Sequence, residues 1–102
     1  MRLTNIYTWA PENAGAVYQR FEDFGRGEAP DAVKEAFANL KVVAWEKLAE
    51  NTVIQVIEGD EASLFTWIGY WDDLGESDPT PSWDLTDTGM LTKLTPPAFM
   101  RQ

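Results

Sequence analysis

The chain has 102 residues, and a chain of this length is expected to form one domain, spanning residues 1–102. Its eight basic and seventeen acidic side chains give a net charge of −9, which disfavours nucleic acid and anionic membrane surfaces as partners. Histidine and cysteine are absent, which excludes disulfides, Cys/His zinc sites, Ser-His-Asp triads and histidine-ligated haem. We therefore expect no metal and no cofactor. With no membrane-length apolar run and no signal peptide, we expect a cytoplasmic protein.

The first forty residues predict a strand followed by two helical segments. Side chains from Leu3 to Trp9 alternate between two faces and include β-branched and aromatic residues, which is the pattern of a strand. Apolar residues recur at helical spacing over 14–24, with Pro11 suited to the first turn and Gly25 to a left-handed end. After the loop GRGEAPDA, the segment DAVKEAFANL predicts a short helix or turn.

The middle of the chain predicts a hairpin and the start of another helix. The segments KVVAWEKLAE (41–50) and TVIQVIEG (52–59) have strand character, and a tight connection at Glu50 and Asn51 predicts that they pair antiparallel. Asp60 is placed to cap the helix that follows, since its side chain can accept a hydrogen bond from a free N–H in the first turn.

The segment SLFTWIGYWDDLG (63–75) predicts an amphipathic helix that Gly75 ends. Five large apolar side chains fall on one arc of about 120°, at about 100° per residue. An aromatic stripe at this spacing normally packs on a sheet, so we interpret its tryptophans as core residues and not as a free-standing ligand platform. The residues on this arc are Leu64, Trp67, Ile68, Trp71 and Leu74.

The end of the chain predicts one more strand. Pro79 and Pro81 exclude a central strand at their own positions, because proline has no N–H to donate to a neighbouring strand. We expect residues 82–94 to supply an irregular edge strand. The apolar tail TPPAFMRQ (95–102) is expected to pack on the domain or on a partner subunit.

The element order β-α-β-β-α-β predicts an α+β, ferredoxin-like domain with one antiparallel sheet and two helices on one face. The other face of such a sheet should be polar. Here both faces carry large apolar side chains, and the simplest cover for the second face is another copy of the chain. We therefore predict a homodimer joined through its sheet faces, a dimeric α/β barrel. One face is assigned Leu3, Tyr7, Trp9, Leu40, Val42, Ala44, Leu48, Val53 and Ile57, and the other Ile6, Val43, Trp45, Ile54 and Val56.

Three segments carry a resemblance to a known family: VYQRFEDFGR (17–26), QVIE (55–58) and WIGYWDDL (67–74). They resemble a family of small uncharacterised bacterial domains within the dimeric α/β-barrel superfamily. Its pattern joins an R-F…G-R helix, a strand that ends in glutamate and a helix with W…W-x-D-L. The resemblance covers most of the chain before Gly75, and it implies the fold and dimerisation but no reaction. Further on, ESDPTPSWDLTDT stands where the family usually continues into a Val/Pro-rich strand.

A candidate ligand pocket is expected between the inner sheet face and the helices. Strand positions 5, 7 and 9 share one face, a neighbouring strand adds position 55, and helix positions 18 and 21 pack over them. Polar groups in an apolar wall can orient a ligand. Alternatively, Asn5 lies near the sheet edge and bonds to the backbone or to water. The candidate residues are Asn5, Tyr7, Trp9, Tyr18, Phe21, Trp45 and Gln55.

Charged residues offer weaker candidates. Arg20 and Arg26 could clamp a ligand carboxylate, but pairing with the acidic side chains between residues 22 and 28 explains them better. The acidic cluster at 72–78 lacks calcium-loop spacing, and we interpret it as a solvated helix end.

Three functions are consistent with the sequence. The first is a homodimeric module whose apolar pocket binds a small hydrophobic or fatty-acid-like molecule. The second, implied by a looser resemblance to cofactor-free oxygenases, is a cofactor-independent monooxygenase or isomerase acting on an aromatic or polyketide-like substrate. That enzyme would place Asn5, Tyr7, Trp9 and Trp45 around the reacting carbon. The third is a purely structural dimer with a filled interior. Polar groups converging inside an open cavity would favour the second function over the first.

Overall fold

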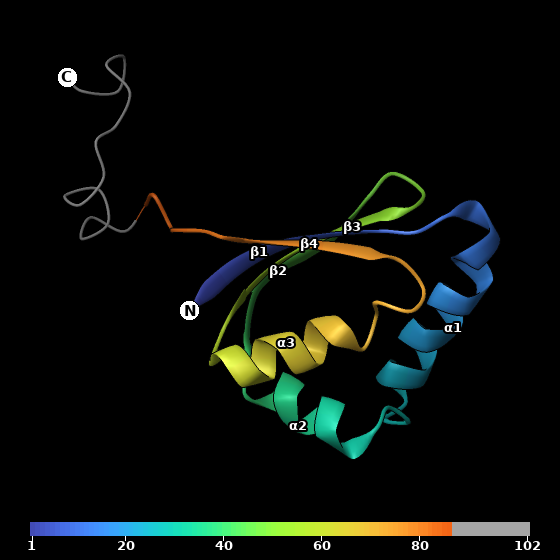
Figure 1. The fold of residues 1–102 in the computed structure, drawn as a ribbon, viewed down its shortest axis with the longest axis horizontal. Helices are drawn as coiled ribbons and strands as arrows, with labels where there is room; N and C mark the ends of the chain where they lie inside the picture. The colour runs from blue at the N-terminus through green and yellow to red at the C-terminus, as the bar shows by residue number, and fades with distance from the viewer. Residues whose placement is uncertain (87–102) are drawn as a thin grey trace, which may run out of the picture.

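The computed structural model of the protein describes residues 1–86 and has an α+β, ferredoxin-like fold. Its four strands form one antiparallel sheet in the order β2-β3-β1-β4. Figure 1 shows the α helices together on one face of this sheet, with no helix on the opposite face. The predicted element order is confirmed, and the short segment after the first helix is itself a helix. The elements are β1 (Arg2–Thr8), a 3-10 helix (Pro11–Asn13), α1 (Ala14–Gly25), α2 (Asp31–Ala38), β2 (Lys41–Leu48), β3 (Thr52–Glu58), α3 (Glu61–Gly69) and β4 (Glu76–Pro81).

Local signals explain the start of α3 and the loop after α1. Asp60 caps α3 as predicted, accepting the N–H of Ser63 at 3.0 Å, and hydrogen bonding from Ser63 lowers the pKa of the Asp60 carboxyl. The connection between β2 and β3 is tight, as predicted. The left-handed residue after α1 is Gly27, with φ of 77°, so the prediction that Gly25 takes this role is wrong.

The helix predicted to run to Gly75 ends earlier. α3 stops at Gly69, and the N–H of Trp71 then bonds to the carbonyl three residues back at 3.1 Å, as in a turn. The Tyr7 hydroxyl donates to the carbonyl of Trp71 at 2.7 Å and ties this turn to β1. Gly75 comes so close to β1 that an added Cβ would clash with the Thr8 carbonyl and lie 2.8 Å from the Tyr7 ring. A tertiary contact with the sheet therefore replaces the last helical turn.

The last strand lies earlier in the chain than predicted. β4 is an edge strand that pairs only with β1, and residues 82–86 contain no strand, so the prediction of a strand from residue 82 is wrong there. Residues 87–94 of that prediction, and the tail 95–102, lie outside the described residues. An edge strand needs hydrogen bonds on one side only, which is why it accommodates Pro79 and Pro81.

A β-bulge in β2 changes which of its residues face the helices. The pairing with β3 shifts between Val42 and Ala44, which adds one residue to β2 and reverses the alternation beyond it. Trp45 therefore pairs with Gln55 and shares its face toward the helices. The assignment of Trp45 to the outer face is wrong, as are the inner assignments of Ala44 and Leu48.

The core is an aromatic cluster centred on Trp67 of α3. This side chain is 1% exposed, and its ring lies 4.6 Å from Phe37, 4.9 Å from Phe24 and 5.6 Å from both Trp45 and Trp71, measured between centroids. The Trp67 indole Nε1 also donates to Oε1 of Gln55 at 2.8 Å. The predicted apolar arc of 64–74 is therefore a core element, as its buried members show.

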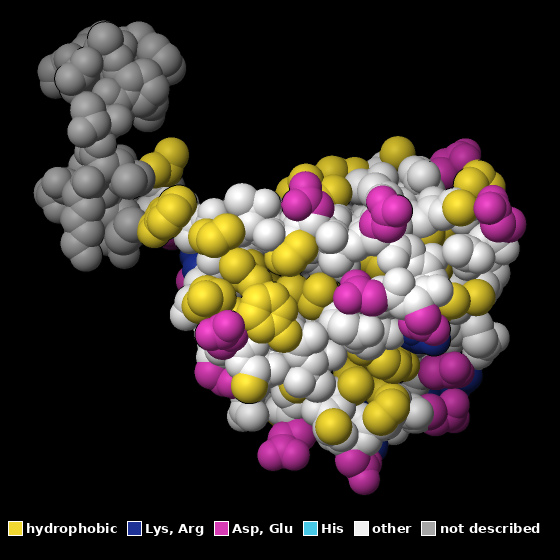
Figure 2. Space-filling view, viewed as in Figure 1, with side chains coloured by type: hydrophobic (Ala, Val, Ile, Leu, Met, Phe, Trp, Pro, Cys, Tyr) yellow, Lys and Arg dark blue, Asp and Glu magenta, His cyan; other side chains and the backbone are white. Residues whose placement is uncertain are grey.

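The outer sheet face carries an apolar stripe across three neighbouring strands. Ile6 on β1 is 41% exposed, Val43 on β2 is 43% exposed, and Ile54 and Val56 on β3 are half-buried. Elsewhere the surface is strongly acidic, and Figure 2 shows hydrophobic patches separated by Asp and Glu side chains on the face in view. Among the described helices, none is long and apolar enough to cross a membrane.

Replacing Trp67 with alanine should destabilise the fold severely. Removal of a large buried aromatic typically costs about 3–5 kcal/mol, against a total stability of about 5–15 kcal/mol for a domain. Phe65→Ala, on the same helix but 49% exposed, is the control and should cost much less. Urea unfolding measures both free energies, and equal losses for the two variants would contradict the central place of Trp67.

Candidate functional site

An open pocket lies between α1 and the β2–β3 hairpin. Its volume is about 390 Å³, within the range of small-molecule sites, and nearly all of its wall surface is apolar. Four of the seven predicted candidate residues line it, supplied by α1, β2 and the segment after β1. Its lining residues are Trp9, Tyr18, Phe21, Trp45, Glu46, Lys47 and Val53.

Aromatic contacts hold the pocket walls in place. Trp9 and Tyr18 meet edge to face, with centroids 6.0 Å apart and planes at 81°. Phe21 packs on Trp45 at 5.9 Å and on Trp71 at 4.5 Å, so one pocket wall is continuous with the core. Trp9 is only 3% exposed, whereas Tyr18 is 43% exposed. The pocket therefore has flat aromatic walls, a buried one formed by Trp9 and an exposed one formed by Tyr18, and such walls suit an apolar or aromatic guest.

The other three candidates, Asn5, Tyr7 and Gln55, are buried on the inner sheet face but do not line this pocket. Gln55 accepts from the Trp67 indole, and its own Nε2 has no partner among the described residues. Tyr7 donates to the Trp71 carbonyl. These polar groups lie in the buried core, and the structure does not bring them to one point in the open pocket.

Asn5 departs from the simpler interpretation that placed it at a sheet edge. It lies on β1, which has β3 on one side and β4 on the other, and it is 6% exposed. Its Oδ1 has no hydrogen-bond partner among the described residues. A buried acceptor without a partner costs about 1–3 kcal/mol. Asn5 is therefore an unmet polar group inside the sheet layer.

Lys47 is a pocket residue that sequence reasoning missed. Its Nζ donates to the Tyr18 hydroxyl at 3.0 Å and lies 5.1 Å from the centroid of the Tyr18 ring. The signal was the register of β2: once the bulge is counted, Lys47 pairs with Val53 and joins Trp45 on the inner face. A strict alternation of side chains from Lys41 would instead place Lys47 on the outer face.

The remaining charged candidates are already paired. Arg20 does not bond to its sequence neighbours as predicted but donates to both carboxylate oxygens of Asp73, and this bonding lowers the pKa of Asp73. Arg26 pairs with Glu22, Asp23 and Glu28, as predicted. Among residues 1–86, no cluster of three or more acidic side chains has the geometry of a metal site.

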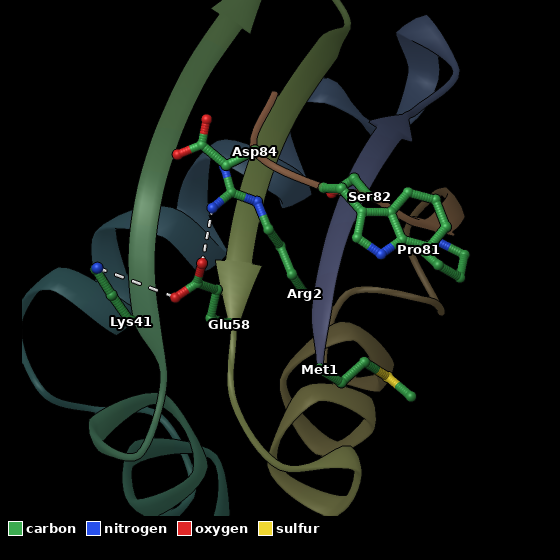
Figure 3. A pocket seen from close by; sticks show the side chains of 8 residues that line it. Met1, Arg2, Lys41, Glu58, Pro81, Ser82 and Asp84 are labelled. Carbon is green, nitrogen blue, oxygen red and sulfur yellow. Dashed lines mark hydrogen bonds and ion pairs between the residues drawn. The ribbon is translucent and has the colours of Figure 1, made fainter. Parts of the chain in front are cut away.

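A second pocket, of about 560 Å³, lies at the end of the sheet where the chain begins. Figure 3 shows that its basic side chains converge on one carboxylate: Arg2 Nη1 lies 2.7 Å from Glu58 Oε1 and Lys41 Nζ lies 4.0 Å from Glu58 Oε2. Asp84 lies beside Arg2 and adds a second negative charge. The two basic side chains of this pocket thus already face carboxylates of the same pocket.

The fold and the pocket define a small ferredoxin-like α+β domain with an apolar, aromatic-walled pocket. A family model described as a domain of unknown function, DUF3303, matches residues 1–94, so the chain belongs to this family. This confirms the resemblance to an uncharacterised domain family. No curated protein and no solved structure matches the chain.

The Tyr7 phenol gives a prediction for pH dependence. Burial raises the pKa of Tyr7 to about 12, although the nearby Arg20 charge opposes the shift. The native state therefore holds this proton more tightly than the unfolded chain, in which the pKa is about 10. Tyr7's contribution to stability should be constant below about pH 10 and be lost as pH rises toward about 12.

Urea unfolding of the protein and of Tyr7→Phe across this pH window measures the effect. The variant should lose the part of the alkaline decline that belongs to Tyr7. Superimposable slopes for the two proteins would show that the phenol is not held protonated by the fold.

Proposed function

We propose that this protein is a homodimeric module that binds a small hydrophobic ligand in the pocket between α1 and the β2–β3 hairpin. The observation that carries the proposal is the pocket itself: four aromatic side chains around a space of about 390 Å³ that is open to solvent. Apolar pockets of this size are the usual form of small-molecule sites. We also propose that residues 1–102 form one domain of a bacterial, cytoplasmic protein in the dimeric α/β-barrel superfamily.

The position of the polar groups favours binding over cofactor-independent catalysis. Trp9 and Trp45 line the pocket, but Asn5 and Tyr7, which the catalytic alternative requires around the same reacting carbon, do not. Tyr7 is also held protonated at neutral pH, so it is a hydrogen-bond donor and not a base. The open pocket likewise favours a binding module over a purely structural dimer with a filled interior.

The uncovered sheet face supports the homodimer. Ile6, Val43, Ile54 and Val56 form an apolar stripe on the side of the sheet that carries no helix (Figure 1). A two-fold dimer requires a self-complementary patch, and an apolar stripe can pack against its own copy. Two sheets stacked in this way would bury an interface of the size that stable dimers use, about 1,200–2,000 Å² in total.

The ligand proposal is tested by equilibrium dialysis with 2-naphthalenemethanol, a neutral aromatic probe. Tyr18→Ala removes the exposed wall of the pocket and should weaken binding about fivefold, since an aromatic contact contributes about 1 kcal/mol. Phe65→Ala removes an equally exposed aromatic from a different surface and should leave binding unchanged. Absence of binding to the unmodified protein would reject the proposal.

The dimer proposal is tested by light scattering at micromolar concentration. The unmodified chain should have twice the monomer mass. Ile6→Lys places a charge in the middle of the stripe and should give a monomer that remains folded by circular dichroism. Phe65→Lys, a similar change away from the stripe, should stay dimeric. A monomer mass for the unmodified protein would exclude the interface.

A further inference from the structure

Lys47 differs from every other basic side chain that the structure describes. Residues 1–86 contain six basic side chains, and five of them have a carboxylate oxygen within 4.0 Å. Lys47 has none within that distance among the described residues. In a chain with seventeen acidic residues, an uncompensated cation is unexpected, and this one lines a pocket whose wall is almost wholly apolar.

Contacts with Tyr18 hold the ammonium group of Lys47 beside the pocket. Its bond to the Tyr18 hydroxyl and its position over the Tyr18 ring hold it at the rim. An ammonium group has three donors, and one is used by Tyr18, so two are available to a guest.

The acidic residue of the pocket lining, Glu46, does not neutralise Lys47. Glu46 pairs with Ile54 on the outer sheet face, whereas Lys47 pairs with Val53 on the inner one. Successive residues of a strand point to opposite faces, so the two side chains leave β2 on opposite sides and form no ion pair within 4.0 Å.

The indole Nε1 of Trp9 also lacks an acceptor among the described residues, but this atom is itself buried and does not face a guest in the open pocket. The group that the pocket offers without a charged partner is thus the ammonium of Lys47. A guest that complements it has an apolar body and an acceptor group, and beside an unpaired cation that group is best an anion.

We propose that the ligand of this pocket is an aromatic carboxylate, whose ring packs between Trp9, Tyr18 and Trp45 and whose carboxylate pairs with Lys47. The inference rests on the proposed function, since it names the ligand class of the same pocket. The net charge of −9 opposes anion binding only weakly, because at physiological salt the repulsion from charges more than about 8 Å away, the Debye length, is largely screened. At contact distance, the positive charge of Lys47 determines that the pocket prefers an anionic ligand.

The test uses three probes with the same ring: 2-naphthoate, 2-naphthalenemethanol and 2-naphthylmethylammonium. Isothermal titration calorimetry of the unmodified protein should give the order anion, neutral, cation, with the anion about fivefold tighter than the alcohol, as a partly exposed ion pair provides. Lys47→Met should bring the anion and the alcohol to equal affinity. Lys47→Arg should retain the preference for the anion.

Lys34→Met is the matched control, because it changes the net charge equally but lies on α2, away from the pocket. It should leave the anion preference intact. If the alcohol and the anion bind the unmodified protein equally, or if the preference survives in Lys47→Met, the carboxylate inference is wrong while the hydrophobic site stands. If none of the probes binds, both the inference and the proposed function are wrong.

Discussion

The structure depends on the placement of one side chain, Trp67, between the sheet and the helices. Its ring meets aromatic residues from α1, α2 and β2 and from the turn after α3, while its indole nitrogen bonds to Gln55 on β3. A domain of 102 residues has a small core, so a single buried tryptophan that touches most of the elements contributes a large share of the stability. The bond to Gln55 also fixes the height of α3 over the sheet, because a buried indole N–H needs an acceptor.

The bulge in β2 explains how the same arrangement leaves a pocket. By turning Trp45 inward, it gives Trp67 a ring to pack against and carries Lys47 to the same face. The pocket forms beyond Trp45, where α1 alone covers the sheet and neither α2 nor α3 contributes a lining residue. The core and the site are therefore adjacent parts of one aromatic layer. Phe21 belongs to both, since it packs on Trp71 on one side and lines the pocket on the other.

The element order and the core could be predicted from the sequence because periodicity and capping are local signals. The alternation of β1, the helical spacing of α1 and the cap at Asp60 all correspond to the structure. Three features depend on contacts between distant segments, and sequence patterns did not show them. The turn after Gly69 is stabilised by Tyr7, and β4 exists because β1 offers it an edge.

The third such feature, the bulge in β2, decides how much of the site could be predicted. Trp9, Tyr18 and Phe21 were named from their face and spacing, and they do line one pocket. Trp45 also lines it, although its predicted face was wrong. Lys47 was missed because a one-residue bulge leaves no clear mark in an alternating pattern. Asn5 and Gln55 were correctly placed on the inner face, but their polar groups lie in the core layer, which alternation cannot distinguish from a pocket floor.

The central claim is that the aromatic layer divides into a core around Trp67 and a binding surface at Trp9 and Trp45. The most direct test is a ¹H–¹⁵N spectrum of the five tryptophan indole groups, recorded while 2-naphthoate is added. The account predicts that the indole signals of Trp9 and Trp45 shift with added probe. The Trp67 signal should move least and exchange slowly with solvent, because its N–H is buried and bonded to Gln55. A spectrum in which Trp67 exchanges rapidly, or in which Trp9 and Trp45 do not respond to the probe, would contradict this division.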